Sequence, residues 1–323
     1  MTLVSAFTSA VLPILAVMGL GYALGSAIDL DVDPLNTVAL YAFLPALIFH
    51  SLATTSLGGG TVLKLFAGVV AFVFLMMGLS EAAGRLWGIT EPYRSALVLA
   101  SAFPNAGFYG IPLAEFAFGG IGRAIAVLYI TAQSFLMYTV GVYVASRGGG
   151  HAGIGAIREI FELPLIYAIA LAVLVRGLGV VPPRDGTIMS TVSLVGDASI
   201  PLMLVIVGVQ LAGLEAGALS RVTIPTVLKL GVAPVVALAI AVGLAFENPT
   251  IARIFVLLCA TPVALIPLAL TIAYSDSDSD REARSTGDIS ASEYLTTAIF
   301  VTTIVSVVVL TVLIAVLQSG TLI

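Results

Sequence analysis

The sequence predicts an all-α polytopic membrane protein whose ten transmembrane helices form two inverted five-helix repeats. The first observation is composition, since 59% of the 323 residues are hydrophobic and only 10% are charged. A soluble domain carries about 25% charged residues. The second is that apolar segments long enough to cross a bilayer recur along the whole chain. The third is that the fourth and ninth of these segments are both interrupted by prolines.

A bilayer core requires about 20 predominantly apolar residues per helix. In the first half, the segments that meet this requirement are residues 3–25, 35–52, 62–79, 93–118 and 124–145. In the second half they are residues 163–181, 187–211, 223–246, 251–274 and 294–317.

The two halves carry short matches in the same order. VLKL occurs at 62–65 and 227–230, and IPLA occurs at 111–114 and 266–269. Because five is an odd number, two five-helix units in one chain must have opposite orientations, as in many secondary transporters. We therefore divide the chain into a first repeat (1–147), a central polar linker (148–162) and a second repeat (163–323).

Basic residues favour a topology with both termini outside the cytoplasm, in the plasma membrane, since cytoplasmic loops are enriched in Lys and Arg. In that topology eight cations fall on inner links, namely Arg85, Arg94, Arg147, Arg158, Arg221, Lys229, Arg281 and Arg284. Five fall on outer links, namely Lys64, Arg123, Arg176, Arg184 and Arg253.

The stretch 101–112, SAFPNAGFYGIP, is the most unusual in the chain. Prolines remove helical N–H donors, and glycines permit backbone conformations that other residues resist. One interpretation is a broken helix that lines a binding site, and the other is a kinked helix with a small-residue packing surface. Its partial repetition at 259–267 favours the broken helix. The predicted helix-break residues are Pro104, Gly107, Gly110, Pro112, Pro262 and Pro267.

Two broken helices in equivalent positions of inverted repeats are expected to cross near the bilayer centre. Each break exposes N–H groups at the start of a half-helix, and such ends attract anions. We interpret the sequence as placing no basic residue deep in any segment, so we expect backbone groups to attract an anion there. The predicted substrate-binding residues are Pro104, Asn105, Ala106, Gly107, Thr261, Pro262, Val263 and Pro45.

Asn105 follows the first break directly. Its amide either forms a hydrogen bond to the substrate or caps its own interrupted backbone. Val263 occupies the corresponding place in the second break, with Thr261 as the only adjacent polar side chain. We therefore expect an asymmetric site.

Other polar side chains fall inside predicted spans. Asp197 is a candidate for proton coupling, because an ionisable residue inside a span is a functional candidate by default. The alternative is that Asp197 lies near a helix end and meets water. Gln133 and Gln210 either form interhelical hydrogen bonds or line a pore.

Several classes of function are not supported by the sequence. We find no metalloprotease, serine-hydrolase or nucleotide-binding motif, so we do not expect an enzyme. Two histidines make a multi-histidine metal centre implausible, and the aspartates of 275–280 are expected to form a solvated loop. No cofactor, no metal and no nucleic-acid partner are predicted. The acidic, lysine-poor composition is typical of a halophilic prokaryote.

The pattern Asn105-x-Gly107-Phe108-x-Gly110-x-Pro112 resembles the signature of the auxin efflux carrier family. Residues 41–49 and 199–208 resemble two further motifs of that family. The resemblance implies a scaffold formed by helices 1, 2, 6 and 7 and a transport domain formed by helices 3–5 and 8–10. It also implies an elevator-like mechanism. The plant carriers have Asn at both breaks, and here only Asn105 matches, which puts auxin-like aromatic acids in doubt as substrates.

We therefore predict a secondary active transporter, a permease that moves a small organic anion, such as a carboxylate, across the lipid bilayer. The first alternative is a sodium-coupled symporter of the bile-acid type. The second is an intramembrane enzyme or receptor-like protein without transport. The coupling ion (proton or sodium) and the oligomeric state stay open, with a homodimer among the arrangements considered.

Overall fold

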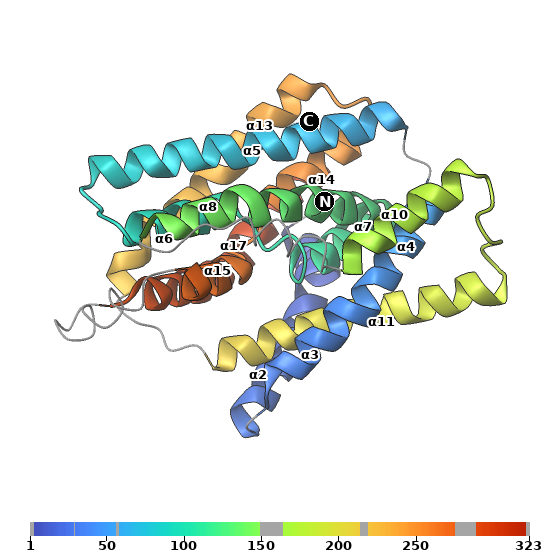
Figure 1. Ribbon diagram of the computed structural model, residues 1–323, viewed down its shortest axis with the longest axis horizontal. Helices are drawn as coiled ribbons and strands as arrows, with labels where there is room; N and C mark the ends of the chain where they lie inside the picture. Colours follow the sequence, from blue (N-terminus) through green and yellow to red (C-terminus); the bar gives the residue numbers. More distant parts are fainter. Residues whose placement is uncertain are drawn as a thin grey trace.

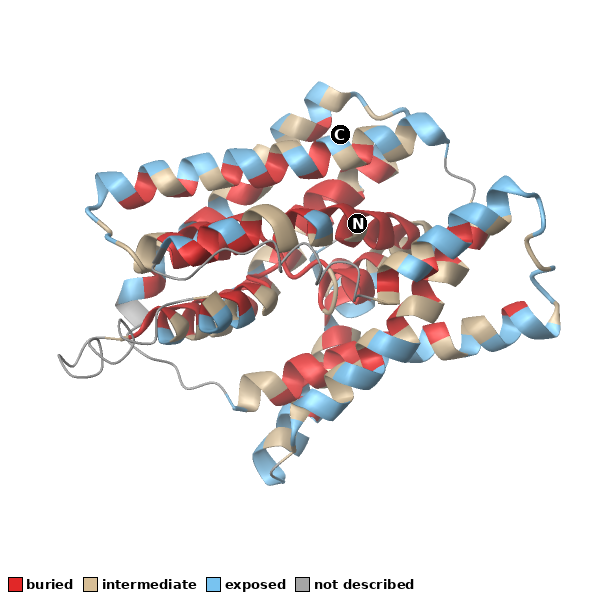
Figure 2. Ribbon diagram, viewed as in Figure 1, coloured by how far each residue is buried: buried red, intermediate tan, exposed pale blue. Residues whose placement is uncertain are grey.

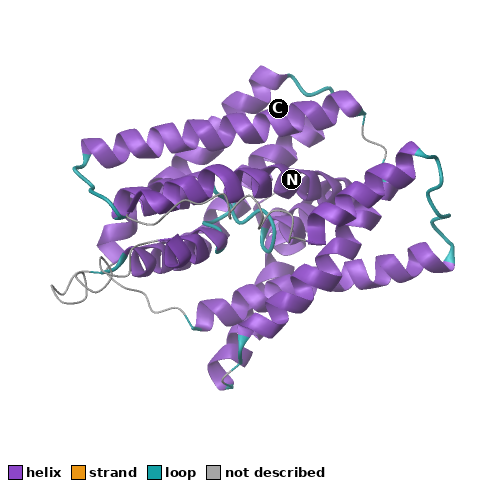
Figure 3. Cartoon of the chain, viewed as in Figure 1, coloured by secondary structure: helices purple, strands orange, loops and turns teal. Residues whose placement is uncertain are grey.

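The computed structural model describes residues 3–28, 30–55, 58–148, 164–213, 219–274 and 289–320, and these residues form helices joined by short loops (Figure 1). Figure 3 shows the same chain by secondary structure, and no strand is drawn in its described part. The one extended pairing among the described residues is an isolated antiparallel bridge between Pro104 and Val263. The predicted linker 148–162 lies outside the described residues except for Gly148.

Seven helices in the described chain are long and apolar enough to cross a membrane. They contain α1 (Leu3–Ala6) with α2 (Leu12–Ala27), α3 (Val32–Val38) with α4 (Leu44–Thr54), α5 (Gly59–Leu86), α7 (Gly110–Leu136) with α8 (Val142–Ala145), α11 (Thr187–Ala212), α12 (Thr223–Val227) with α13 (Ala233–Leu244), and α17 (Ala291–Ser319). Shorter helices are α6 (Tyr93–Ala102), α10 (Pro164–Gly177), α14 (Pro249–Cys259) and α15 (Ile266–Tyr274). The prediction of an all-helical polytopic protein is confirmed, whereas the ten-helix inverted repeat stays a prediction.

Three of the long helices contain a widened, π-helical turn that ends two positions before a proline. These turns span Phe7–Val11, Ala39–Phe43 and Leu228–Val232, and the prolines that follow are Pro13, Pro45 and Pro234. Proline cannot donate the helical hydrogen bond, and its ring crowds the preceding turn. A π-bulge accommodates the mismatch without ending the helix.

The long helix α7 changes direction at Gly119, which has φ 68° and ψ −152°. Glycine adopts positive φ without the steric penalty that a Cβ imposes. Close by, a Cβ on Gly122 would lie 1.9 Å from the carbonyl oxygen of Ala114. The bend falls between the predicted fourth segment, which ends at 118, and the fifth, which begins at 124.

The helices pack in two groups that both draw on the two halves of the chain (Figure 1). The first group, called here the α11 group, consists of α2, α4, α10 and α11. The second, called the α7 group, is built from α5, α6, α7, α13, α14 and α17. In the α11 group, helices α2 and α11 approach very closely, because a Cβ on Gly208 would lie 2.1 Å from the carbonyl oxygen of Met18.

Burial is greatest in the middle of the molecule, and the outer helix faces are exposed (Figure 2). Large apolar side chains such as Leu63, Leu194 and Val173 lie on these outer faces. In a multi-pass membrane protein such faces contact lipid tails, which are as apolar as leucine. The buried middle contains both interrupted helices.

Candidate functional site

Two helices are interrupted in the buried middle of the protein. Helix α6 ends at Ala102 and α7 begins at Gly110, while α14 ends at Cys259 and α15 begins at Ile266. Pro104 and Pro262 lie inside these interruptions, where each lacks the N–H that a continuing helix needs. The predicted break residues Gly110, Pro112 and Pro267 instead lie in the first turn of α7 or α15, so they mark where the helix resumes.

The two interruptions meet, and their backbones bond to each other in an antiparallel arrangement. The N–H of Asn105 donates to the carbonyl of Pro262 at 2.8 Å, and the N–H of Ala264 donates to the carbonyl of Phe103 at 3.1 Å. Unwound backbone at membrane depth needs partners within the protein. Each interruption therefore satisfies polar groups that the other leaves open.

Side chains from α7, α17 and the Thr223–Leu244 span hold this crossing. Gln133 Nε2 of α7 donates to the carbonyl of Pro104 at 2.9 Å. Thr302 Oγ1 of α17 accepts from the N–H of Val263 at 3.2 Å, and Lys229 Nζ donates to the carbonyl of Cys259 at 3.3 Å. The sequence singled out Gln133 but neither Thr302 nor Lys229 in this role, because a Thr among many in an apolar helix carries no distinctive pattern.

A cavity of about 480 Å³ opens beside the crossing. This volume lies within the range of about 300–1,000 Å³ for small-molecule sites. Both breaks, α7, α11 and the start of the second span contribute to its walls. Its polar side chains come from Asp33, Asn36, Asn105, Gln133, Ser134, Tyr138 and Gln210.

Asn105 is the polar side chain of the first break that faces this cavity. The residue is 7% exposed. Within the described chain its side-chain amide forms no hydrogen bond to the interrupted backbone, which is not what the capping interpretation expects. The buried Oε1 atoms of Gln133 and Gln210 also have no hydrogen-bond partner among the described residues. Buried polar atoms are normally satisfied, so these amides are open to a ligand.

The starts of two half-helices also face the cavity. Gly107 and Phe108 precede α7, and Leu265 and Ile266 stand at the beginning of α15. Among the described backbone hydrogen bonds outside the helices, none uses the N–H of Gly107, Phe108 or Leu265. Free N–H groups at a helix start carry partial positive charge.

The predicted site residues divide into those that line the cavity and those that support it. The lining includes Pro104, Asn105, Gly107, Gln133 and Gln210. Buried in or beside the crossing but absent from the cavity wall are Ala106, Thr261, Pro262 and Val263. Pro45 lies at the bend of the second span, where its neighbour Leu44 contacts the cavity instead.

The expectation of no basic side chain at depth is wrong. Lys229 is fully buried inside the Thr223–Leu244 span, and its ammonium lies 5.5 Å from the centre of the Phe72 ring. The Nζ of Lys229 lies beside the C-terminal end of α14, where helix carbonyls carry partial negative charge. Without Lys229, the count of loop cations becomes seven against five (8 − 1 = 7), and the orientation of the termini stays a prediction.

Asp197, the candidate for proton coupling, does not line the cavity. Its carboxylate pairs with Arg123 of α7 at 2.5 Å and accepts from Ser193 Oγ at 3.1 Å. Arg123 also bonds to Glu115 across the Gly119 bend, with Nε to Oε2 at 2.7 Å. Because Asp197 belongs to α11 and Arg123 to α7, this ion pair joins the two groups of helices.

A multi-pass helical protein with two interrupted helices that pair beside a polar cavity has the architecture of a membrane transporter. The comparison with known families agrees, because a model described as "Membrane transport protein" matches residues 6–314. The chain belongs to this family, the auxin efflux carrier family, as the sequence motifs indicated.

Two curated relatives are archaeal. An uncharacterized transporter of Methanothermobacter thermautotrophicus is 28% identical over 288 residues, which cover 84% of this chain and 90% of the relative. An uncharacterized transporter of Methanocaldococcus jannaschii is 26% identical over 185 residues, which cover 55% of this chain and 59% of the relative. Membership of a transporter family is consistent with the prediction of a non-enzyme.

Proposed function

We propose that the cavity at the crossing binds a small organic anion, such as a carboxylate, and that the protein carries it across the plasma membrane. The observation that carries this proposal is the Asn105 amide, which is buried, faces the cavity and has no bond to its own backbone among the residues that the structure describes. The half-helix starts beside it supply partial positive charge. Lys229 lies behind the second break, where its Nζ donates to the carbonyl of Cys259.

The charges of the lining bear on the class of substrate. Asp33 is the only charged side chain that lines the cavity within the described residues, and it lies on an exposed part of α3. The attraction for a carboxylate therefore has to come from backbone N–H groups and amides at the buried end. This arrangement favours a compact anion over one with several charges.

The test of the site is transport and binding with purified protein in liposomes, screened across dicarboxylates, indole acids and amino acids. We expect Asn105→Ala to weaken substrate binding by about tenfold, the loss of one hydrogen bond to a charged group. Ser134→Ala, on the same cavity wall, serves as the matched control and should change affinity much less. Unchanged affinity in Asn105→Ala would reject its proposed role.

We further propose that the chain crosses the membrane ten times, with α6 and α7 up to Gly119 as the broken fourth helix and α14 with α15 as the broken ninth. In this proposal the α11 group is the scaffold and the α7 group is the transport domain of an elevator. The packing within each group, which is denser than the packing between them, and the position of the cavity beside both groups support this proposal.

Asp197 enters this proposal as a proton-coupling residue that acts through its ion pair. Movement of the α7 group would separate Arg123 from Asp197 and leave the carboxylate free to take up a proton. We expect an imposed pH gradient to drive transport by the wild-type protein and not by Asp197→Asn. Transport that ignores the gradient in both proteins would reject proton coupling.

Sodium coupling, as in a bile-acid-type symporter, is the alternative with some support in the structure. Asp33 and Asn36 place oxygen atoms on the cavity wall. Within the described residues, however, no three His, Cys, Asp or Glu side chains gather as a metal site. A sodium gradient that drives uptake at constant pH would favour this alternative over proton coupling.

A further inference from the structure

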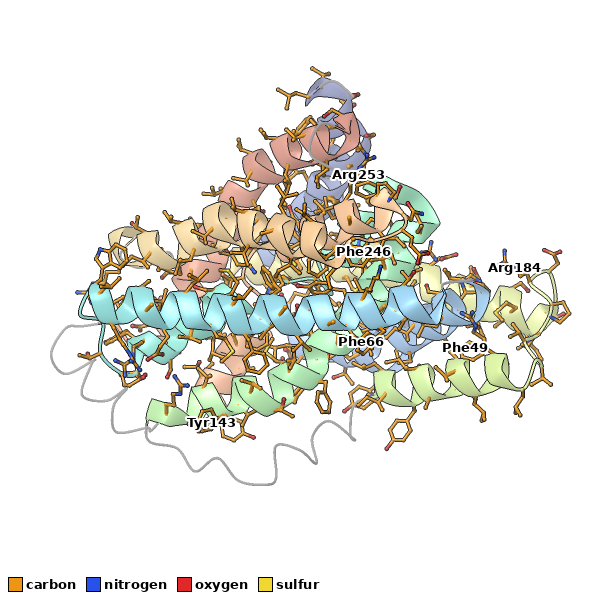
Figure 4. The ribbon with its side chains drawn as sticks, turned by 90° about the horizontal axis from the view of Figure 1, so that it is seen from above. Phe49, Phe66, Tyr143, Arg184, Phe246 and Arg253 are labelled. Atoms are coloured by element: carbon orange, nitrogen blue, oxygen red, sulfur yellow. The ribbon has the colours of Figure 1, made fainter. Side chains whose placement is uncertain are left out.

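A second, lateral groove lies outside the crossing cavity, between α5 and α7 on one side and α10 with the end of α4 on the other. Its volume is about 570 Å³, and apolar residues such as Phe66, Ile169 and Val173 form most of its wall. Figure 4 shows Phe66 on the side of α5 that faces this groove. Val173 is exposed on the outer face of α10, so the groove opens toward lipid.

The groove continues along α10. A smaller cavity of about 300 Å³ shares Phe66, Thr131 and Ile169 with it and extends to Leu165. From Leu165 to Arg176 the helical rise is about 16 Å, at 1.5 Å per residue. The hydrocarbon core is about 30 Å thick, so the groove spans about the depth of one leaflet.

The groove ends at a pair of arginines. A pocket of about 220 Å³ shares Thr55 and Arg176 with the groove and adds Arg184. Figure 4 shows Arg184 at the end of the molecule where α10 and α11 are connected. The guanidinium of Arg176 donates to the carbonyl of Leu52 at 2.8 Å and to that of Thr55, while Arg184 donates to the carbonyl of Thr54.

These backbone carbonyls do not neutralise the two positive charges. Neither arginine takes part in an ion pair among the described residues. No acidic side chain lines the pocket, although Asp185 follows Arg184 in the chain. A guanidinium has five N–H donors, so both arginines keep donors for a further acceptor.

We propose that the groove and its two arginines form a binding site for one anionic phospholipid. The phosphate binds Arg176 and Arg184, and an acyl chain fills the groove along α10. Guanidinium groups match the geometry of phosphate, and basic pockets between transmembrane helices bind anionic head groups. Because the groove is walled by both helix groups, the bound lipid contacts both of them.

The test is native mass spectrometry of delipidated protein incubated with phosphatidylglycerol, phosphatidylcholine or inorganic phosphate. We expect at least fivefold greater retention of phosphatidylglycerol than of phosphatidylcholine, and no displacement of the lipid by inorganic phosphate. The variant Arg176→Gln with Arg184→Gln should retain phosphatidylglycerol only as well as phosphatidylcholine. Arg85→Gln is the matched control, because Arg85 is an exposed cation that pairs with Glu81, and its retention should equal the wild type.

A second variant covers the case in which the arginine variant fails to fold, since both arginines also hold the end of α4. Ile169→Trp fills the groove and leaves the arginines intact, so it should reduce phosphatidylglycerol retention at least fivefold while the protein elutes as a single species. Equal retention of both lipids, full retention by the arginine variant or by Ile169→Trp, or displacement by inorganic phosphate would each overturn the proposal.

Discussion

Asn105 and Gln133 are buried amides on the wall of the same cavity, and their side chains have different hydrogen-bond partners. Asn105 makes its backbone bond to Pro262 and leaves its side chain to the cavity, whereas Gln133 commits its Nε2 to the carbonyl of Pro104. Gln133 therefore combines the two roles that its position suggested, since it bonds across helices and lines the cavity. Substitutions at these amides should consequently separate binding from stability.

We expect Gln133→Leu to lower the stability of the protein, because it leaves the carbonyl of Pro104 without that donor. The loss should be about 1 kcal/mol, which is the usual range for a hydrogen bond between membrane helices. Thermal unfolding in detergent measures it. Gln210→Leu is the control, since its Oε1 has no partner among the described residues, and a loss there as large as in Gln133→Leu would contradict the assignment.

The Arg123–Asp197 pair should contribute modestly to stability. Asp197 keeps 50% of its side chain exposed, and partly exposed pairs are worth about 0.2–1 kcal/mol. A double-mutant cycle with Arg123→Gln and Asp197→Asn, followed by thermal unfolding, measures this coupling. A second cycle with Arg123→Gln and Glu115→Gln measures the contact inside the α7 group. Zero coupling between Arg123 and Asp197 would mean that their ion pair does not hold the two groups together.

At the scale of residues, the sequence identified the cavity side chains that lie at a helix break or are polar within an apolar span. Pro104, Asn105 and Gly107 break a helix, and Gln133 and Gln210 are polar inside apolar spans. Lys229 was missed because its charge was assigned to a loop, although the span that contains it continues on both sides. Ser134, Thr302 and Asn36 were missed because nothing in their local pattern distinguishes them from other polar residues.

At the scale of elements, α2 and α11 approach each other very closely, and glycines lie at this contact. Helices in a membrane associate through close packing, since lipid tails are as apolar as the helices themselves. Gly208 and Gly21 face each other's helix so closely that a Cβ on either would overlap a backbone carbonyl oxygen. Glycine at these two positions therefore permits the close approach of α2 and α11.

We expect Gly208→Ala to destabilise the protein by about 1–3 kcal/mol, the usual penalty for overpacking. Gly19→Ala is a matched control on α2, because a Cβ at Gly19 meets no atom within 4 Å. Thermal unfolding of both variants in detergent measures the difference. Equal melting temperatures would show that α2 and α11 separate easily at this contact.

Helix positions followed from the sequence better than helix boundaries did. Apolar length located the spans, and the prolines located both interruptions. The predicted breaks were longer than the observed ones, since Gly110, Pro112 and Pro267 lie in a first helical turn, which accepts these residues. The π-helical turns before Pro13, Pro45 and Pro234 were not predicted, because hydropathy does not register one extra residue per turn.

At the scale of the whole molecule, the two groups of helices meet around the crossing, and Arg123–Asp197 is a contact between them. Which helices would pack together was predicted from the resemblance to a family, and not from the sequence repeat. The pairing of the two breaks depends on contacts between residues about 160 positions apart, which no local pattern encodes. The family match establishes a transporter, and the movement of the groups is our proposal.

The elevator proposal predicts that tying the two groups together stops transport. In a Cys259→Ser background, Arg123→Cys and Asp197→Cys can be bridged by a cleavable thiol cross-linker. We expect substrate exchange across liposomes without a pH gradient, which does not require the Asp197 carboxylate, to stop on cross-linking and to recover on cleavage, with the unbridged double variant as the control. Full transport by the bridged protein would mean that these groups do not move apart at this contact.

The hydrogen bonds that join one break to the other are made by main-chain groups, and this has a consequence for which residues can change at the crossing. Main-chain groups are the same for every residue except proline, so Val263 can change without dismantling the meeting point. The first break therefore has Asn105 and the second has Val263, although main-chain bonds hold both breaks. Side chains at the breaks can therefore be replaced one at a time while the main-chain bonds that pair the two breaks stay in place.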